Sequence, residues 1–121
     1  MLNILIVEYN RAMRSLIKSI ISDLARDVTE CADGAEALSA YAECRPDWVL
    51  MDIKMKEMNG ISATRQIKAA FPDANIMIVT DYDDAYQREA ARSAGACEYV
   101  MKEKLLDVRR ILGAPKSQAA H

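Results

Sequence analysis

The feature that most constrains this chain is a short apolar run, Trp48 to Met51, that stops on a carboxylate at Asp52. Apolar residues in direct succession, without polar alternation, predict a strand that is buried on both faces of a parallel sheet. Asp52 then falls at the carboxyl end of that strand, where open α/β sheets place their ligand crevice. Taken alone, Asp52 could simply end the strand or cap a turn, so the other strand ends decide its role.

Short strand patterns alternate with helical patterns along the whole chain. The predicted strands cover residues 3–7, 27–31, 48–52, 75–79 and 97–101. The predicted helices cover about 13–24, 33–45, 60–70, 83–93 and 105–112. This alternation builds right-handed βαβ units, which place the strands parallel in one sheet with helices on both faces. The sequence therefore predicts an α/β fold, a doubly wound five-stranded parallel sheet.

Local signals mark the ends of two predicted helices. Asp33 and Glu36 form a capping box, in which Asp33 caps the helix and Glu36 reaches back to it. Gly95 follows the segment 83–93 at the position of a C-cap. Residues 113–121 have no hydrophobic periodicity, so we interpret them as a tail or linker after a single domain of residues 1–112.

Composition argues against several classes of protein. A chain of 121 residues with 51% hydrophobic residues is large enough for one domain with its own core. The net charge is −2 and Lys and Arg are scattered, which argues against direct nucleic-acid binding and against a membrane surface. The apolar segments are too short to span a bilayer. The three cysteines lack metal-ligand spacing, which favours free thiols in a reducing cytoplasm.

Four of the predicted strands stop beside polar residues, namely Glu8, Asp52, Thr80 and Lys102. Because the carboxyl ends of parallel strands open at one edge of a sheet, we expect these side chains to converge. Two carboxylates, a hydroxyl and an ammonium suit Mg²⁺-assisted transfer of a phosphoryl group to a carboxylate. Asp52 would be the nucleophile, which gives an acyl phosphate.

The chain resembles the receiver domain of two-component response regulators from Ile4 to about Leu112. The matching segments are Ile4-Leu5-Ile6-Val7-Glu8, Asp33-Gly34-Ala35-Glu36-Ala37-Leu38, Val49-Leu50-Met51-Asp52-Ile53-Lys54-Met55, Met58-Asn59-Gly60, Ile78-Val79-Thr80 and Gly95-Ala96-Cys97-Glu98-Tyr99-Val100-Met101-Lys102. The resemblance implies a flavodoxin-like fold with strand order 2-1-3-4-5. It also implies a signalling module that accepts a phosphoryl group from a phosphohistidine of a sensor histidine kinase and is not a turnover enzyme.

The resemblance assigns roles to the residues of the expected pocket. Asp52 is the phosphoacceptor, and Thr80 and Lys102 are the phosphate-sensing hydroxyl and the ion-pairing lysine. Glu8 and Asp52 belong to the Mg²⁺ pocket, together with the backbone carbonyl of Lys54.

The resemblance also implies a switch and an interaction surface. Tyr99 is the aromatic residue that swings inward on activation. The surface lies on the fourth helix, the fifth strand and the fifth helix, and it could form a homodimer. Its basic residues would be Arg88, Arg92, Lys104 and Arg109, which could equally be a solvated helix surface.

Three positions depart from the family pattern. Tyr9 stands where the family has a second acidic residue that binds Mg²⁺, so binding should be weakened, with Asp81 as a possible replacement. A phenol is a poor ligand near neutral pH. Lys56 stands where proline is usual, which adds a positive charge near the phosphate site. Glu103 replaces the proline that many members have after this lysine, so we expect a trans peptide there.

The Lys102-Glu103 pair resembles the subgroup whose receivers precede a helix-turn-helix DNA-binding domain. Here we expect either a stand-alone receiver or a truncated chain that ends in its linker. Tyr9 either marks impaired phosphorylation or is an introduced substitution.

Two other functions compete with a phosphoryl-accepting module. The first is a phosphorylation-impaired pseudo-receiver, which would act as a binding or dimerisation scaffold because Tyr9 has weakened the metal site. The second is an aspartate-nucleophile phosphatase of the haloacid-dehalogenase type. Such enzymes need a second Asp two residues after the nucleophile, and that position holds Lys54.

Overall fold

Five parallel strands form one sheet in the order β2-β1-β3-β4-β5 in the computed structural model, which describes residues 1–114. The strands are β1 (Leu2–Val7), β2 (Ala25–Cys31), β3 (Trp48–Met51), β4 (Ile76–Thr80) and β5 (Glu98–Met101). The helices are α1 (Arg11–Ile21), α2 (Ala37–Cys44), α3 (Gly60–Ala70), α4 (Ala85–Ala94) and α5 (Leu106–Leu112). Short 3₁₀ turns are η1 (Gly34–Glu36) and η2 (Lys102–Lys104). The predicted fold and strand order are confirmed; most of the predicted tail, 115–121, lies outside the described residues.

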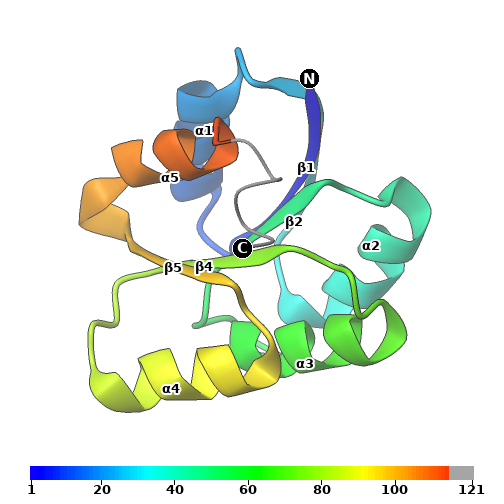
Figure 1. Ribbon diagram of the computed structural model, residues 1–121, viewed down its shortest axis with the longest axis vertical. Helices are drawn as coiled ribbons and strands as arrows, with labels where there is room; N and C mark the ends of the chain where they lie inside the picture. The colour runs from blue at the N-terminus through cyan, green and yellow to red at the C-terminus, as the bar shows by residue number, and fades with distance from the viewer. Residues whose placement is uncertain (115–121) are drawn as a thin grey trace.

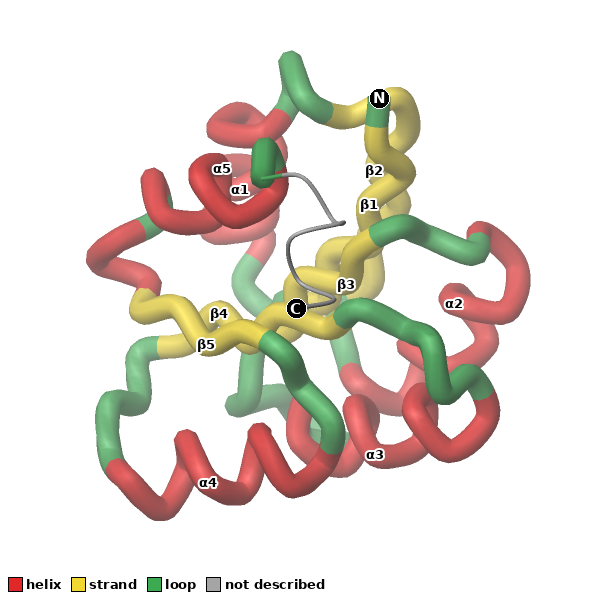
Figure 2. Tube along the Cα trace, in the orientation of Figure 1, coloured by secondary structure: helices red, strands yellow, loops and turns green. Residues whose placement is uncertain are grey.

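The sheet is covered on both faces, with α1 and α5 on one side and α2, α3 and α4 on the other (Figures 1 and 2). One core cluster lies on each face. The residues of β3 and β4 are all buried, which explains why these strands are apolar without alternation. Polar residues can therefore appear only where these central strands end, and those ends define one edge of the sheet.

Strand boundaries differ slightly from the prediction. β2 begins at Ala25 rather than residue 27, because Ala25 pairs with Leu2 across a register shift. β4 includes Thr80, which pairs with Met101 of β5. Backbone pairing extends both strands past their apolar runs. The hydrophobic pattern of the sequence does not show which residues pair, so it did not predict these extensions.

Side-chain caps begin three of the helices. Asn10 Oδ1 accepts from the Met13 N–H at the start of α1, and Asp84 Oδ1 accepts from the Gln87 N–H at the start of α4. Asn59 caps α3 in the same way. The C-cap of α4 is Gly95 with φ +111°, which confirms its predicted role.

The predicted capping box is only half formed. Asp33 Oδ1 accepts from the Ala35 N–H, as a cap does. The carboxylate of Glu36 instead accepts from the Ala32 N–H at 3.3 Å, so the prediction that it reaches back to Asp33 is wrong. The 3₁₀ turn η1 at this point changes where the Glu36 side chain can reach.

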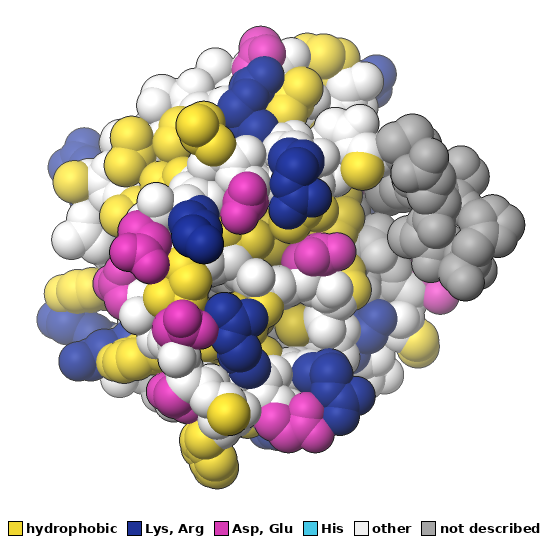
Figure 3. All heavy atoms as spheres, turned by 60° about the vertical axis from the view of Figure 1, so that its left-hand side comes forward, with side chains coloured by type: hydrophobic (Ala, Val, Ile, Leu, Met, Phe, Trp, Pro, Cys, Tyr) yellow, Lys and Arg dark blue, Asp and Glu magenta, His cyan; other side chains and the backbone are white. Residues whose placement is uncertain are grey.

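Three further features bear on the predictions. The described residues contain no cis peptide bond, so Lys102 and Glu103 are joined in trans as expected. Within residues 1–114, none of the helices combines the length and the apolar character that a bilayer crossing requires. Acidic and basic side chains are interspersed on the face shown in Figure 3, which brings forward the left-hand side of Figure 1.

Candidate functional site

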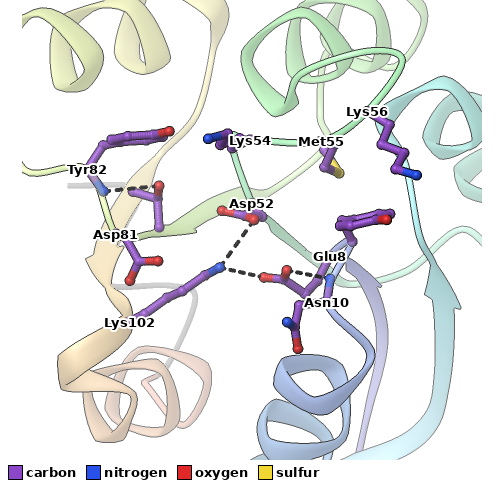
Figure 4. A pocket seen from close by; sticks show the side chains of 11 residues that line it. Glu8, Asn10, Asp52, Lys54, Met55, Lys56, Asp81, Tyr82 and Lys102 are labelled. Atoms are coloured by element: carbon purple, nitrogen blue, oxygen red, sulfur yellow. Dashed lines mark hydrogen bonds and ion pairs between the residues drawn. The ribbon is translucent and has the colours of Figure 1, made fainter.

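The polar residues of the strand ends converge in one pocket at the carboxyl edge of the sheet (Figure 4). The pocket has a volume of about 500 Å³. Glu8 follows β1, Asp52 follows β3, Thr80 ends β4 and Lys102 follows β5, and all four line it. We call these four buried or nearly buried residues the inner half of the pocket. The predicted convergence is confirmed.

Lys102 is the centre of the inner half, because its ammonium group lies between the two carboxylates. Lys102 Nζ donates a hydrogen bond of 3.2 Å to Asp52 Oδ2 and forms an ion pair of 2.8 Å with Glu8 Oε1. Burial favours the neutral amine, but the two carboxylates have the stronger effect and raise the pKa of Lys102. The ammonium form therefore persists through the physiological range.

The remaining carboxylate oxygens accept backbone hydrogen bonds. Asp52 Oδ1 accepts from the Ile53 N–H at 2.8 Å, and Glu8 Oε2 accepts from the Asn10 N–H at 2.9 Å. Desolvation and the nearby Glu8 charge raise the pKa of Asp52 to about 6, although Lys102 acts in the opposite direction. At neutral pH Asp52 is mainly ionised, which is the form that a nucleophile requires.

A chain of hydrogen bonds joins the pocket to the α4–β5 side of the domain. The buried Thr80 Oγ1 accepts from the Tyr82 N–H at 3.3 Å. The carbonyl of Tyr82 in turn accepts a hydrogen bond of 2.6 Å from the Tyr99 hydroxyl. The Arg88 guanidinium lies 4.5 Å from the centre of the Tyr99 ring and pairs with Asp83 at 2.7 Å. Thr80 and Tyr99 are thus connected through one residue, Tyr82.

The opposite rim of the pocket is formed by Tyr9 and Lys56, which we call the rim pair. Tyr9 is 48% exposed, and the Lys56 ammonium lies 5.2 Å from the centre of its ring. The neighbouring Tyr9 side chain raises the pKa of Lys56. Tyr9 therefore lines the pocket without filling it, and it brings a second lysine to the rim.

The inner half can hold a divalent cation, but with few ligands. Glu8 Oε1 is buried and lies 2.8 Å from Lys102 Nζ, so a bound cation would share this oxygen with the ammonium group. Magnesium is commonly held by one or two protein carboxylates together with phosphate oxygens and water, and Glu8 and Asp52 fit that donor set. Residues 1–114 contain no cluster of three acidic, His or Cys side chains suited to a metal, so Asp81 does not complete one. Lys102 already occupies the space between the two carboxylates.

Asp33 is a site residue whose role sequence reasoning missed. Besides capping η1, its carboxylate accepts hydrogen bonds from the N–H groups of Glu57 at 2.9 Å and Met58 at 3.1 Å. Burial works against ionisation, but these backbone donors lower the pKa of Asp33. Asp33 therefore fastens the loop after Asp52, which carries Lys56, to the η1 turn.

Two glycines allow close approaches around the same loop. A Cβ on Gly34 would overlap the Met58 carbonyl, and a Cβ on Gly60 would overlap the Asp52 carbonyl. Both positions require the absence of a side chain for reasons of space. Both glycines lie in segments that match the family pattern, but the close contacts that require them, to Met58 and to Asp52, are not visible in the sequence.

The predicted basic surface is divided between two faces. Arg88 and Arg92 lie on α4 and pair with Asp83 and Glu89. Arg109 instead faces α1, where it binds the Ile20 carbonyl at 2.7 Å and Asp23 at 2.5 Å. Arg109 is thus engaged within the domain and does not extend the predicted interaction surface.

The fold and the pocket define a class of protein: a doubly wound α/β domain with an aspartate, a lysine and a hydroxyl gathered at the carboxyl edge of its sheet. The family model for the response regulator receiver domain matches residues 4–112. The chain belongs to this family, and it is a phosphoryl-accepting signalling module of the receiver type.

Relatives and solved structures agree with this assignment. The chain is 42% identical over 90 residues to the uncharacterized transcriptional regulatory protein YhcZ of Bacillus subtilis (strain 168), covering 71% of this chain and 42% of that protein. It is 37% identical over 100 residues to the chemotaxis protein CheY of Thermotoga maritima, covering 82% and 83% of the two chains. A two-component response regulator of the LuxR family from Aurantimonas sp. SI85-9A1 superposes with a TM-score of 0.84 at 31% identity, covering 93% and 85%. The chain spans about half the length, or less, of the first curated relatives that it matches.

Proposed function

We propose that Asp52 is the residue that accepts the phosphoryl group, from a phosphohistidine of a sensor histidine kinase. The observation that carries this proposal is the buried Asp52 carboxylate, held 3.2 Å from Lys102 Nζ in a pocket that also contains Thr80. An Asp52 oxygen attacks phosphorus, the bond from phosphorus to the donor nitrogen breaks, and the histidine, protonated beforehand on its other ring nitrogen, leaves as the neutral imidazole.

The inner half supplies the electrostatic stabilisation for this transfer. Lys102 is already in the ammonium form. From its position beside Asp52 it can form an ion pair with the oxygens of the incoming phosphoryl group. The Thr80 hydroxyl has a donor proton that can be turned toward a phosphoryl oxygen. Magnesium held by Glu8, Asp52 and the Lys54 carbonyl would neutralise further negative charge, with an affinity lowered by Tyr9.

The hydrogen-bond chain supports a switch at Tyr99. If the Thr80 hydroxyl turns toward a phosphoryl oxygen, the Tyr82 N–H loses its acceptor. The Tyr82 carbonyl, which holds Tyr99, is then free to shift. We infer that phosphorylation changes the surface around α4, β5 and α5 by this route. This surface would serve a homodimer or a partner.

The relatives support a proposal about the longer protein to which this domain belongs. YhcZ is named a transcriptional regulatory protein, and the chain covers less than half of it. We infer that the receiver controls a DNA-binding output domain in a longer cytoplasmic regulator, and that its own role is regulatory rather than that of a turnover enzyme.

Intact-mass spectrometry tests the proposal. The chain is incubated with Mg²⁺ and a small acyl phosphate, with Asp52→Asn as the control. We expect a single phosphoryl adduct that is absent from Asp52→Asn. An adduct that persists in Asp52→Asn would contradict the assignment of the acceptor. An adduct that appears only in Tyr9→Asp would favour the pseudo-receiver scaffold instead.

A further inference from the structure

The two substitutions that distinguish this pocket from the family pattern are in contact with each other. Tyr9 follows β1 and Lys56 lies on the loop after β3, yet the Lys56 ammonium is 5.2 Å from the Tyr9 ring centre. Both line the pocket that holds Asp52. Tyr9 removes a negative charge from this rim, and Lys56 adds a positive one beside it. Both substitutions of the rim pair therefore make the pocket less negative than the family pattern would.

The charged side chains that line the pocket sum to a net charge of zero before any metal is added. The acidic ones are Glu8, Asp52 and Asp81, and the basic ones are Lys54, Lys56 and Lys102. With an acid at position 9 and no lysine at position 56, the same pocket would carry a net negative charge. A phosphoryl group brings additional negative charge, so a strongly acidic pocket depends on a divalent cation more than a balanced one does.

Among the described residues, two of the three lysines that line the pocket, Lys54 and Lys56, have no carboxylate within ion-pair distance, and Lys56 is the one that packs on Tyr9. Lys102 is committed to Glu8 and Asp52 at 2.8 and 3.2 Å. Lys56 has no carboxylate within ion-pair distance among residues 1–114, and its ammonium rests on an aromatic ring. Figure 4 shows Lys54 and Lys56 extending to opposite sides of the pocket, with Lys102 entering from below. The backbone that carries Lys56 is fixed through the hydrogen bonds of Asp33 to the residues that follow it.

We propose that Lys56, held on Tyr9, stabilises the phosphoryl group at Asp52 and replaces part of the charge that Mg²⁺ supplies to a more acidic pocket. The chain then accepts a phosphoryl group from small acyl phosphates at a rate that depends only weakly on Mg²⁺. In this reaction an Asp52 oxygen bonds to phosphorus, the donor's P–O bond breaks and the donor's carboxylate leaves. This inference rests on the proposed role of Asp52.

Labelling kinetics in saturating Mg²⁺ and in EDTA test the inference. The variants are Lys56→Gln, the conservative Lys56→Arg, and Arg65→Gln, which removes one positive charge from an exposed position on α3. In EDTA we expect Lys56→Gln to label about fivefold more slowly than the unmodified chain, as one partly screened charge predicts. Lys56→Arg should restore most of the rate, and Arg65→Gln should leave it unchanged.

A binding measurement provides a second readout that does not depend on phosphorylation. Mg²⁺ is titrated while the melting temperature is followed. Removing the Lys56 charge should tighten Mg²⁺ binding about threefold, because one repelling cation is lost. A purely structural role for Lys56 would lower the melting temperature without changing the Mg²⁺ dependence.

The outcomes separate this inference from the proposed function. Normal labelling in Mg²⁺ with none in EDTA, or equal EDTA rates for Lys56→Gln and the unmodified chain, would overturn the role of Lys56 and leave Asp52 as the acceptor. Absence of labelling in both conditions would overturn both proposals.

Discussion

The two sides of the pocket differ in burial, in connection and in how they relate to the family pattern. The inner half is buried, and its carboxylates each bind Lys102 and a backbone N–H. The rim pair is exposed and is joined by one cation–π contact. The inner half keeps the residues that the receiver family implies. The rim pair, Tyr9 and Lys56, stands at two positions where the family usually has other residues. From this comparison we expect that phosphoryl acceptance is retained while the dependence on metal is changed.

The largest effect is expected from Lys102→Met, which removes the cation of the inner half and leaves Glu8 and Asp52 facing each other. Loss of a preorganised positive charge should slow acyl-phosphate labelling about 100-fold. Labelling rates from intact mass measure this, with Lys104→Met as the control. Circular dichroism checks that the variant is folded. A labelling rate within a few-fold of that of the unmodified chain would show that the positive charge of Lys102 is not the one on which the transfer depends.

A second prediction concerns the pH dependence of stability. Between the unfolded pKa of about 3.8 and the folded value of about 6, the folded chain binds more protons at Asp52, so the stability contributed by Asp52 falls as pH rises. Asp52→Asn removes this ionisation. It should raise the free energy of unfolding by about 1–2 kcal/mol at pH 7, after allowance for solvent screening, and by nothing near pH 4.

Urea unfolding at the two pH values measures this difference. Glu8 and Lys102 face Asp52, and both are unchanged in the variant. A stabilisation that is equal at the two pH values would show that ionisation of Asp52 is not its cause.

Tyr9→Asp tests the rim pair, because it places a carboxylate at the rim of the pocket. An added oxygen ligand should tighten Mg²⁺ binding about tenfold. Calorimetric titration measures it, and Tyr86→Asp is the matched control because Tyr86 is 79% exposed on α4, outside the pocket. Equal affinities in the two variants would mean that Tyr9 does not stand at a ligand position.

The smallest effect is expected for Asp33→Asn, which alters neither side of the pocket directly. Loss of the charge-assisted bonds to the Glu57 and Met58 N–H groups should cost about 1 kcal/mol of unfolding free energy. It should also speed hydrogen exchange at these two amides. Asp27→Asn on β2 is the control. Unchanged exchange at both amides would show that Asp33 does not hold the loop.

The fold and the inner half were predictable because their signals are local. Trp48 to Met51 show that a strand is covered on both faces, and the polar residues at the strand ends must then meet at one edge. Even the replacement at Tyr9 was visible, since it stands next to Glu8 in the chain.

The remaining features depend on contacts between distant segments. The bonds from Asp33 span 24 and 25 residues, and the pairing of Arg109 with Asp23 spans 86. The cation–π contact between Lys56 and Tyr9 joins two loops that follow different strands. Such contacts are set by how the loops pack above the sheet, which hydrophobic periodicity does not encode.

The most direct test of the account is to locate the phosphoryl group. The labelled chain is reduced with borohydride, which converts an aspartyl phosphate to the corresponding alcohol, and is then mapped by peptide mass spectrometry. The account predicts that the modification falls on Asp52 alone and is unchanged in position when Tyr9 or Lys56 is replaced. Modification at Glu8, Asp33 or Asp81 would contradict it.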